Sequence, residues 1–130
     1  MKFRKMMGVT AAFLCAALAL SGCGSTDETA YRIGIVQQDE HSSLDAATQG
    51  FEDKLMELLG EENVTFDYQN AQGEQANSTT IATKFVSDGC DLILANGTTA
   101  LQSAAAATAD IPIVGTSVTD YIAAGAVNSN

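Results

Sequence analysis

The chain has 130 residues, of which 46% are hydrophobic, and sixteen acidic against six basic residues give it a formal net charge of −10. Such an acidic surface repels phosphate backbones, which argues against nucleic acid as a partner. The roughly 100 residues that follow the N-terminal region are enough for one small domain.

The first 22 residues have the layout of a secretory signal. Basic residues between Lys2 and Lys5 precede an apolar run from Gly8 to Leu20, and small residues follow it. The run is shorter than the roughly 20 apolar residues that a membrane-spanning helix needs. It leads into Leu20-Ser21-Gly22-Cys23, which resembles the lipobox of bacterial lipoproteins, where the cysteine receives a diacylglyceryl group and becomes the new N-terminus.

We therefore expect residues 1–22 to be a lipoprotein signal peptide, Cys23 to be lipidated and residues 23–30 to form a flexible tether. The alternative is an ordinary signal peptide with a cysteine at its junction. Removal of the signal takes three basic and no acidic residues, which leaves a formal charge of −13. Because that charge gives no attraction to an anionic membrane, the lipid must supply the anchoring, at about 0.8 kcal/mol per buried CH₂.

Strand and helix patterns alternate from residue 31 onward. In chain order the sequence predicts a strand over 32–37, a helix over 44–58, a strand over 64–68, a helix over 75–87, a strand over 91–95, a helix over 99–109, a strand over 111–115 and a last helical segment from about Thr119. This alternation predicts an α/β fold with an open parallel sheet and helices on both faces.

Two of these helices are amphipathic. Their predicted buried stripes are Leu44, Ala47, Phe51, Leu55 and Leu58 in the first, and Ile81, Ala82, Phe85 and Val86 in the second. Gly60 and Gly89 follow as stop signals. Once Cys15 leaves with the signal and Cys23 is lipidated, Cys90 is the last cysteine, so no internal disulfide is expected and Cys90 is predicted to be a small buried hydrophobe.

Polar loops follow three of the predicted strands, at residues 38–43, 96–99 and 116–120. Open parallel sheets bind ligands outside the carboxyl ends of their strands. Thr99 with Gln102 has the spacing of a capping box, and Ser117 with Asp120 is close to it. The hydroxyl groups in these loops either only cap helices or, together with helix N-termini, form a rim that suits a carboxylate or another small anion.

The chemistry of a cofactor or of catalysis has little support. His41 is the only histidine, and together with the acids Asp39 and Glu40 it offers too few coordinating groups to predict a metal site. We expect His41 instead either to contact a bound small molecule or to be a solvated loop residue. The loop after the first strand contains no glycine-rich motif for a dinucleotide or phosphate. No nucleophile elbow is present either, so we expect neither a cofactor nor an enzyme.

Several segments carry a family resemblance. The most specific is 67–74 (DYQNAQGE), and others in matching order are 33–37, 40–41, 44–45, 50–51, 81–82, 84–85, 91–93, 111–114 and 119–120. Together with the lipobox they resemble the ABC transporter substrate-binding lipoproteins of the tryptophan/tyrosine type. The resemblance implies a type I periplasmic-binding-protein fold, in which two α/β lobes close over a small ligand, usually an aromatic amino acid.

The resemblance implies that residues 31–130 are the N-terminal lobe and that the second lobe is absent, so the chain is expected to be a fragment. It also implies ligand contacts, mainly to a carboxylate and to polar edges, from His41, Ser42, Gly97, Thr98, Thr99, Ser117, Thr119 and Asp120. Tyr121 stands where the family pattern leads us to expect proline. It is the only aromatic residue near these loops, so stacking on an aromatic ligand would depend on it or on the second lobe.

The expected function is that of a lipid-anchored, extracytoplasmic solute-binding component of an ABC importer. It would bind an amino acid in an interlobe cleft, deliver it to permease subunits and perform no catalysis. The alternative is an extracellular ligand-sensing module of a signalling system, because the same bilobal fold serves both purposes.

Overall fold

The computed structural model describes residues 30–127, so the predicted signal peptide, Cys23 and nearly all of the predicted tether lie outside the described residues. Its elements are β1 (Tyr31–Gln37), α1 (Ser42–Leu59), a 3-10 turn η1 (Glu61–Asn63), β2 (Val64–Asn70), α2 (Gln75–Ser87), β3 (Leu92–Asn96), α3 (Thr98–Ala107) and β4 (Ile113–Thr116). Among the helices of residues 30–127, none combines the length and the apolar character that crossing a membrane requires.

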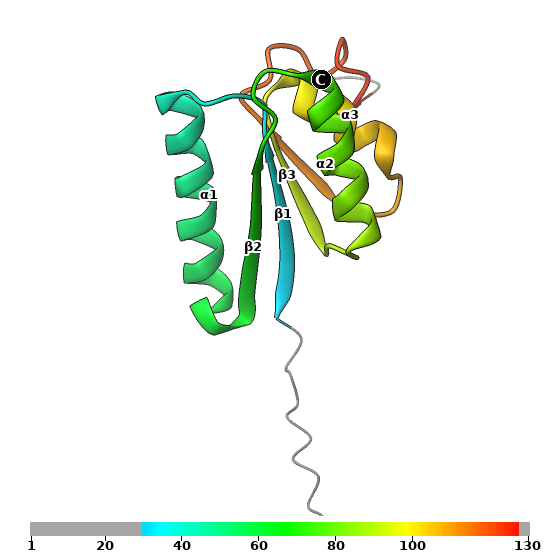
Figure 1. Ribbon diagram of the computed structural model, residues 1–130. Helices are drawn as coiled ribbons and strands as arrows, with labels where there is room; N and C mark the ends of the chain where they lie inside the picture. Colours follow the sequence, from blue (N-terminus) through cyan, green and yellow to red (C-terminus); the bar gives the residue numbers. More distant parts are fainter. Residues whose placement is uncertain (1–29, 128–130) are drawn as a thin grey trace, which may run out of the picture.

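The four strands form one parallel sheet in the order β2-β1-β3-β4. The chain crosses from β1 to β2 in one direction, and from β2 over β1 to β3 and on to β4 in the other. Because such crossovers are right-handed, a reversal of direction moves the connecting helix to the opposite face of the sheet. Accordingly α1 covers one face, while α2 and α3 cover the other (Figure 1). The predicted parallel sheet with helices on both faces is confirmed.

Each face of the sheet has its own apolar layer, because successive strand residues point to opposite sides. Ile33, Ile35 and Leu94 face α1, where they pack with Phe51, Leu55 and Met56. Val36, Ile93 and Ala95 face the other helices, where they pack with Phe85, Leu101 and Ala104. Cys90 is buried in this second layer, as predicted.

Gly34 allows α2 to approach the sheet closely. A Cβ atom at this position would lie 2.6 Å from ring atoms of Phe85, a distance that side chains do not tolerate. The ring therefore rests directly on the backbone of β1. This contact sets the distance between α2 and β1, the strand whose carboxyl end leads into the site described below.

Two residues of the predicted buried stripes are exposed. Leu58 is 65% exposed and Val86 is 36% exposed. Leu58 lies in the last turn of α1, where Met56 rather than Leu58 packs against the sheet. Val86 lies on the flank of α2, because Ser78, Ala82 and Phe85 form the inner line of that helix.

The helical segment predicted from Thr119 is wrong, since residues 121–125 form hydrogen-bonded turns. The N–H of Ala124 donates to the carbonyl of Asp120 at 3.0 Å, and the N–H of Ala126 donates to Tyr121 at 3.1 Å. Gly125, at φ +71, takes the left-handed conformation that ends a helical turn. Residues 120–125 therefore form a single turn and no longer helix.

Candidate functional site

Three polar loops begin at the same edge of the sheet. The strand register places Gln37 level with Asn96, and Asn96 level with Thr116, at the carboxyl ends of β1, β3 and β4. Helices α1 and α3 start at this edge on opposite faces (Figure 1). It is the point where the strand order reverses, which is where open α/β sheets bind ligands.

A buried polar triad of Gln37, Thr48 and Asn96 lies beneath this edge. The hydroxyl of Thr48 donates to Oε1 of Gln37 at 2.8 Å and accepts from Nδ2 of Asn96 at 3.0 Å. Both amide side chains are fully buried. Buried polar groups are normally hydrogen-bonded, and the bonds within this triad join β1, β3 and α1.

The triad also holds the first turn of α1. Nε2 of Gln37 donates to the Asp45 carboxylate at 2.7 Å and to the carbonyl of Asp39 at 2.9 Å. Nδ2 of Asn96 donates to the carbonyl of Leu44 at 2.8 Å. The start of α1 is therefore fixed to both central strands. Oδ1 of Asn96 has no partner among the residues that the structure describes.

His41 and Ser42 lie where α1 begins. His41 is the N-cap, and its Nδ1 accepts the N–H of Ser43 at 3.2 Å and lies 2.7 Å from the Ser43 hydroxyl. Both residues are exposed. Within residues 30–127 no group of histidine, cysteine and acidic side chains has the arrangement of a metal site. One ring nitrogen of His41 is thus engaged in capping, and Ser42 presents its side chain to solvent.

Residues Gly97 to Thr99 form the start of α3. Gly97 is the N-cap at φ +120, and its N–H donates to the carbonyl of Thr116 at 2.9 Å. The predicted capping box of Thr99 and Gln102 is wrong, because α3 begins at Thr98 and Thr99 already lies inside the helix. The N–H of Thr99 donates instead to Oε1 of Gln38, at 3.0 Å.

Ser117, Thr119 and Asp120 follow β4 and are exposed. Ser117 has a positive φ of 56°, a conformation that is uncommon outside glycine and that is often found at functional sites. Oδ1 of Asp120 accepts the N–H of Ile122 at 2.9 Å and that of Ala123 at 3.0 Å. Asp120 rather than Ser117 therefore caps the turn that follows.

Tyr121 packs back onto β4. Its hydroxyl donates to the carbonyl of Gly115 at 2.8 Å, and a Cβ atom on Gly115 would lie 2.9 Å from its ring. The ring also belongs to the apolar layer between the sheet and α3. Tyr121 is thus held against β4 by the fold of this lobe.

The eight predicted contact residues lie in the three loops at this edge or in the first turns of α1 and α3 that follow them. Sequence reasoning missed Gln38 and the polar triad. The pair Gln37-Gln38 at the end of an apolar strand was the available signal, because a polar side chain at the end of a buried strand requires a partner.

The basic residues of the described chain, Arg32, Lys54 and Lys84, all lie outside these loops. A negatively charged group at this edge would therefore meet backbone N–H groups, hydroxyls and the positive end of α3 rather than a cationic side chain. Such an arrangement can bind a small polar ligand, and it offers no basic side chain for proton transfer apart from His41.

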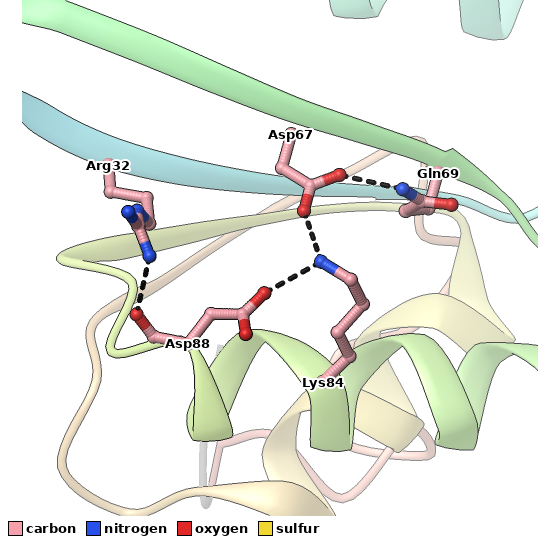
Figure 2. Close-up of polar contacts among 5 residues, drawn as sticks. All are labelled: Arg32, Asp67, Gln69, Lys84 and Asp88. Carbon is pink, nitrogen blue, oxygen red and sulfur yellow. Dashed lines mark hydrogen bonds and ion pairs between the residues drawn. The ribbon is translucent and has the colours of Figure 1, made fainter.

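The shifted pKa values belong to other parts of the molecule. Figure 2 shows a charged cluster of Arg32, Asp67, Lys84 and Asp88, in which Nζ of Lys84 contacts both carboxylates, at 2.5 and 2.6 Å. Hydrogen bonds from Lys84 and Gln69 lower the pKa of Asp67, and the two carboxylates raise the pKa of Lys84. Burial raises the pKa of Cys90 and of Glu52.

Comparison with known proteins gives consistent matches. Residues 32–130 match the family model described as ABC transporter substrate binding protein. The chain is 39% identical to a tyrosine-binding protein of Clostridioides difficile (strain R20291), over 98% of this chain and 41% of that protein. The chain therefore spans about two fifths of the length of this curated relative.

Solved structures show the same fold. A substrate-binding protein with adhesive properties from Clostridium difficile, in its ligand-free, open form, is 44% identical with a TM-score of 0.73, over 76% of this chain and 34% of that one. An ABC domain from Streptococcus pneumonia in complex with L-Trp is 33% identical with a TM-score of 0.73, over 78% of this chain and 35% of that one. The described residues thus correspond to a single lobe of these larger proteins.

Proposed function

The chain belongs to the ABC transporter substrate-binding proteins, and from this membership we propose that it binds an aromatic amino acid for import. In this proposal residues 31–130 are the N-terminal lobe, and the ligand is enclosed between it and a second lobe. The closed form docks on permease subunits. The protein performs no catalysis, in keeping with a family whose members bind and deliver substrates.

The observation that carries the proposal is the convergence of three polar loops at the switch point of the sheet. The N-cap of α3 is Gly97, which has no side chain of its own to satisfy the first N–H groups of the helix. A ligand carboxylate can therefore accept from the backbone of Thr98 and from the hydroxyls of Thr98, Ser117 and Thr119. His41 and Ser42 lie at the far side of the same edge.

The charge at this edge also fits a zwitterion. Asp120 is exposed and uses Oδ1 for the turn after β4, so Oδ2 can accept from a ligand ammonium group.

A relative of this chain is named as a tyrosine-binding protein, and another was solved with L-Trp. Those ligands support an aromatic amino acid here. Because Tyr121 is packed on β4, we assign the stacking surface to the second lobe.

The proposal includes a membrane anchor. Substrate-binding proteins of this family act outside the cytoplasm, and we propose that residues 1–22 direct export and that Cys23 carries the lipid. The expected outcome of Cys23→Ala is loss of labelling by radioactive palmitate and release of the protein from the membrane fraction. Continued labelling of the Cys23→Ala protein would contradict the assignment.

The direct test of ligand binding is an NMR titration of the chain from Gly24 onward with L-tyrosine, L-tryptophan and L-phenylalanine. We expect at least one of them to shift the amide signals of Gly97, Thr98, Ser117 and Thr119, because backbone N–H groups would contact the carboxylate. Tyramine, which has the ring of tyrosine but no carboxylate, serves as the control and should leave these signals unchanged. Shifts confined to other parts of the sheet, or none with any aromatic amino acid, would overturn the proposal.

A further inference from the structure

Gln38 connects the loop after β1 to the start of α3. Its side-chain oxygen accepts the N–H of Thr99 at 3.0 Å, and its own N–H donates to the carbonyl of Asn96 at 2.9 Å. Its carbonyl accepts the N–H of Gly73 at 2.8 Å. The residue is thus held by its backbone on two sides and reaches across to α3 with its side chain.

Gly97 provides the space for this side chain. A Cβ atom at position 97 would lie 2.5 Å from Cβ of Gln38 and 2.6 Å from its Oε1. Gly97 also takes a φ of +120°, which favours glycine, and its N–H donates to Thr116 in β4. Gln38 therefore lies directly over the residue that connects β3 to α3 and that is hydrogen-bonded to β4.

We propose that Gln38 is a positioning residue of the ligand site. It caps α3 from a different loop and holds the loop after β1 at a fixed spacing from Gly97, Thr98 and Thr116. This inference rests on the proposed function, because it assigns the spacing of the ligand contacts to Gln38. It adds a residue that lies outside the eight predicted contacts.

The geometry favours positioning over direct ligand contact. The only described acceptor for the Thr99 N–H is Gln38, since the N-cap of α3 contributes no side chain. The cap occupies the Thr99 N–H and leaves the N–H and hydroxyl of Thr98 for a ligand. If the cap is lost, the first turn of α3 frays, and the donors that the ligand needs no longer keep a fixed direction.

The first test measures the cap without any ligand. Hydrogen exchange of the Thr99 amide is followed in the chain from Gly24 onward and in its Gln38→Ala, Gln38→Asn and Gln38→Glu variants. We expect exchange to become about fivefold faster or more in the first two, which lack an acceptor in reach, as a lost helix cap predicts. Gln38→Glu should restore protection, because its carboxylate can accept the same N–H. Gln49→Ala, which removes an exposed glutamine from α1, is the matched control and should change nothing.

The second test measures binding of the aromatic amino acid that the parent chain prefers. We expect Gln38→Ala to weaken binding about fivefold or more, in step with the loss of the cap. Gln38→Glu should also weaken binding although it keeps the cap, because its charge repels the ligand carboxylate. That loss should shrink when salt is raised, whereas the loss in Gln38→Ala should not.

Each outcome separates this inference from the proposed function. Unchanged Thr99 exchange in Gln38→Ala would overturn the cap, and with it the inference, whatever the ligand does. Faster exchange with unchanged affinity would reduce Gln38 to a structural role and leave the proposed function intact. Failure of the parent chain to bind any aromatic amino acid would overturn the proposed function, and the positioning role with it, even if the cap is found.

Discussion

The buried polar triad and the charged cluster fasten helices to the same sheet by opposite means. The triad of Gln37, Thr48 and Asn96 uses neutral groups that are excluded from solvent. The charged cluster uses ions that remain in water, with 48% of the Lys84 side chain and 29% of the Asp67 side chain exposed. Burying an ion is costly, whereas a buried neutral amide needs only hydrogen-bond partners.

The two devices have different consequences for the site. The neutral triad supports the carboxyl edge without placing a fixed charge beneath it, so the field that a ligand meets there comes from helix ends, hydroxyls and exposed acids. The charged cluster holds α2 to β1 and β2, away from the three polar loops. The comparison therefore predicts that disrupting the triad is severe and insensitive to salt, while disrupting the charged cluster is mild and sensitive to it.

The largest effect is expected for Asn96→Ala. The change removes the donor to Thr48 and to the carbonyl of Leu44, and it leaves buried polar atoms without partners. We expect a loss of about 2–4 kcal/mol in the free energy of unfolding, measured by urea denaturation, from two buried hydrogen bonds. The loss should be the same in low salt and in 1 M NaCl, where the Debye length is about 3 Å. A loss that shrinks in high salt would refute the assignment of a neutral network.

A smaller effect is expected for Tyr121→Phe. The change removes one hydrogen bond, from the tyrosine hydroxyl to the carbonyl of Gly115, while the ring keeps its place on β4. We expect denaturation to show a loss of about 0.5–1.5 kcal/mol. The affinity for an aromatic amino acid should stay within about twofold of the parent, because the ring does not face the ligand. A large drop in affinity at unchanged stability would instead place Tyr121 in the site.

The sequence predicted the elements better than the contacts between them. The strand over 32–37 and the helix over 75–87 were predictable because their apolar residues follow the periods of strand and helix. Leu58 and Val86 were misplaced because the angle at which a helix meets the sheet decides which flank of its stripe is buried. The helical segment predicted from Thr119 is reduced to a single turn, because Gly125 takes a left-handed conformation that ends it.

The edge of the sheet that carries the candidate site could be predicted from the sequence, but the contacts within that site could not. The rule that ligands bind at the carboxyl ends of parallel strands indicated all three loops. The bond between Gln38 and Thr99 joins residues that are 61 positions apart, and the bond between Asn96 and Thr48 spans 48. Such contacts depend on strand order and register, which no local pattern contains. Local reasoning therefore assigned the cap of α3 to Thr99, the residue that in fact donates to Gln38.

A mild effect that depends on salt is expected for Lys84→Met. The methionine keeps the apolar stem of the side chain and removes the contacts to Asp67 and Asp88. Because exposed ion pairs are screened by salt, the Tm difference from the parent should be visible in low salt and disappear in 1 M NaCl. Lys54→Met, which breaks an exposed pair within α1, is the matched control. A difference that persists in high salt would show that packing rather than charge fastens α2.

The smallest effect is expected for Asp67→Asn, and it should depend on pH. The pKa of Asp67 is lowered in the folded chain from its ordinary value of 3.8, chiefly by the hydrogen bond from Lys84. A carboxyl group with a lowered pKa stabilises the fold above its unfolded value and loses that contribution as the pH falls through the folded value. Since the pKa of Lys84 is raised, the lysine stays charged throughout this range. The parent should therefore be more stable than Asp67→Asn by a constant margin above about pH 5, and the margin should vanish in stronger acid.

Asp110→Asn, which removes an exposed carboxylate outside the charged cluster, should show no such convergence with the parent. A margin for Asp67→Asn that is independent of pH would mean that Asp67 has the same pKa in the folded and the unfolded chain, so that Lys84 does not stabilise its carboxylate.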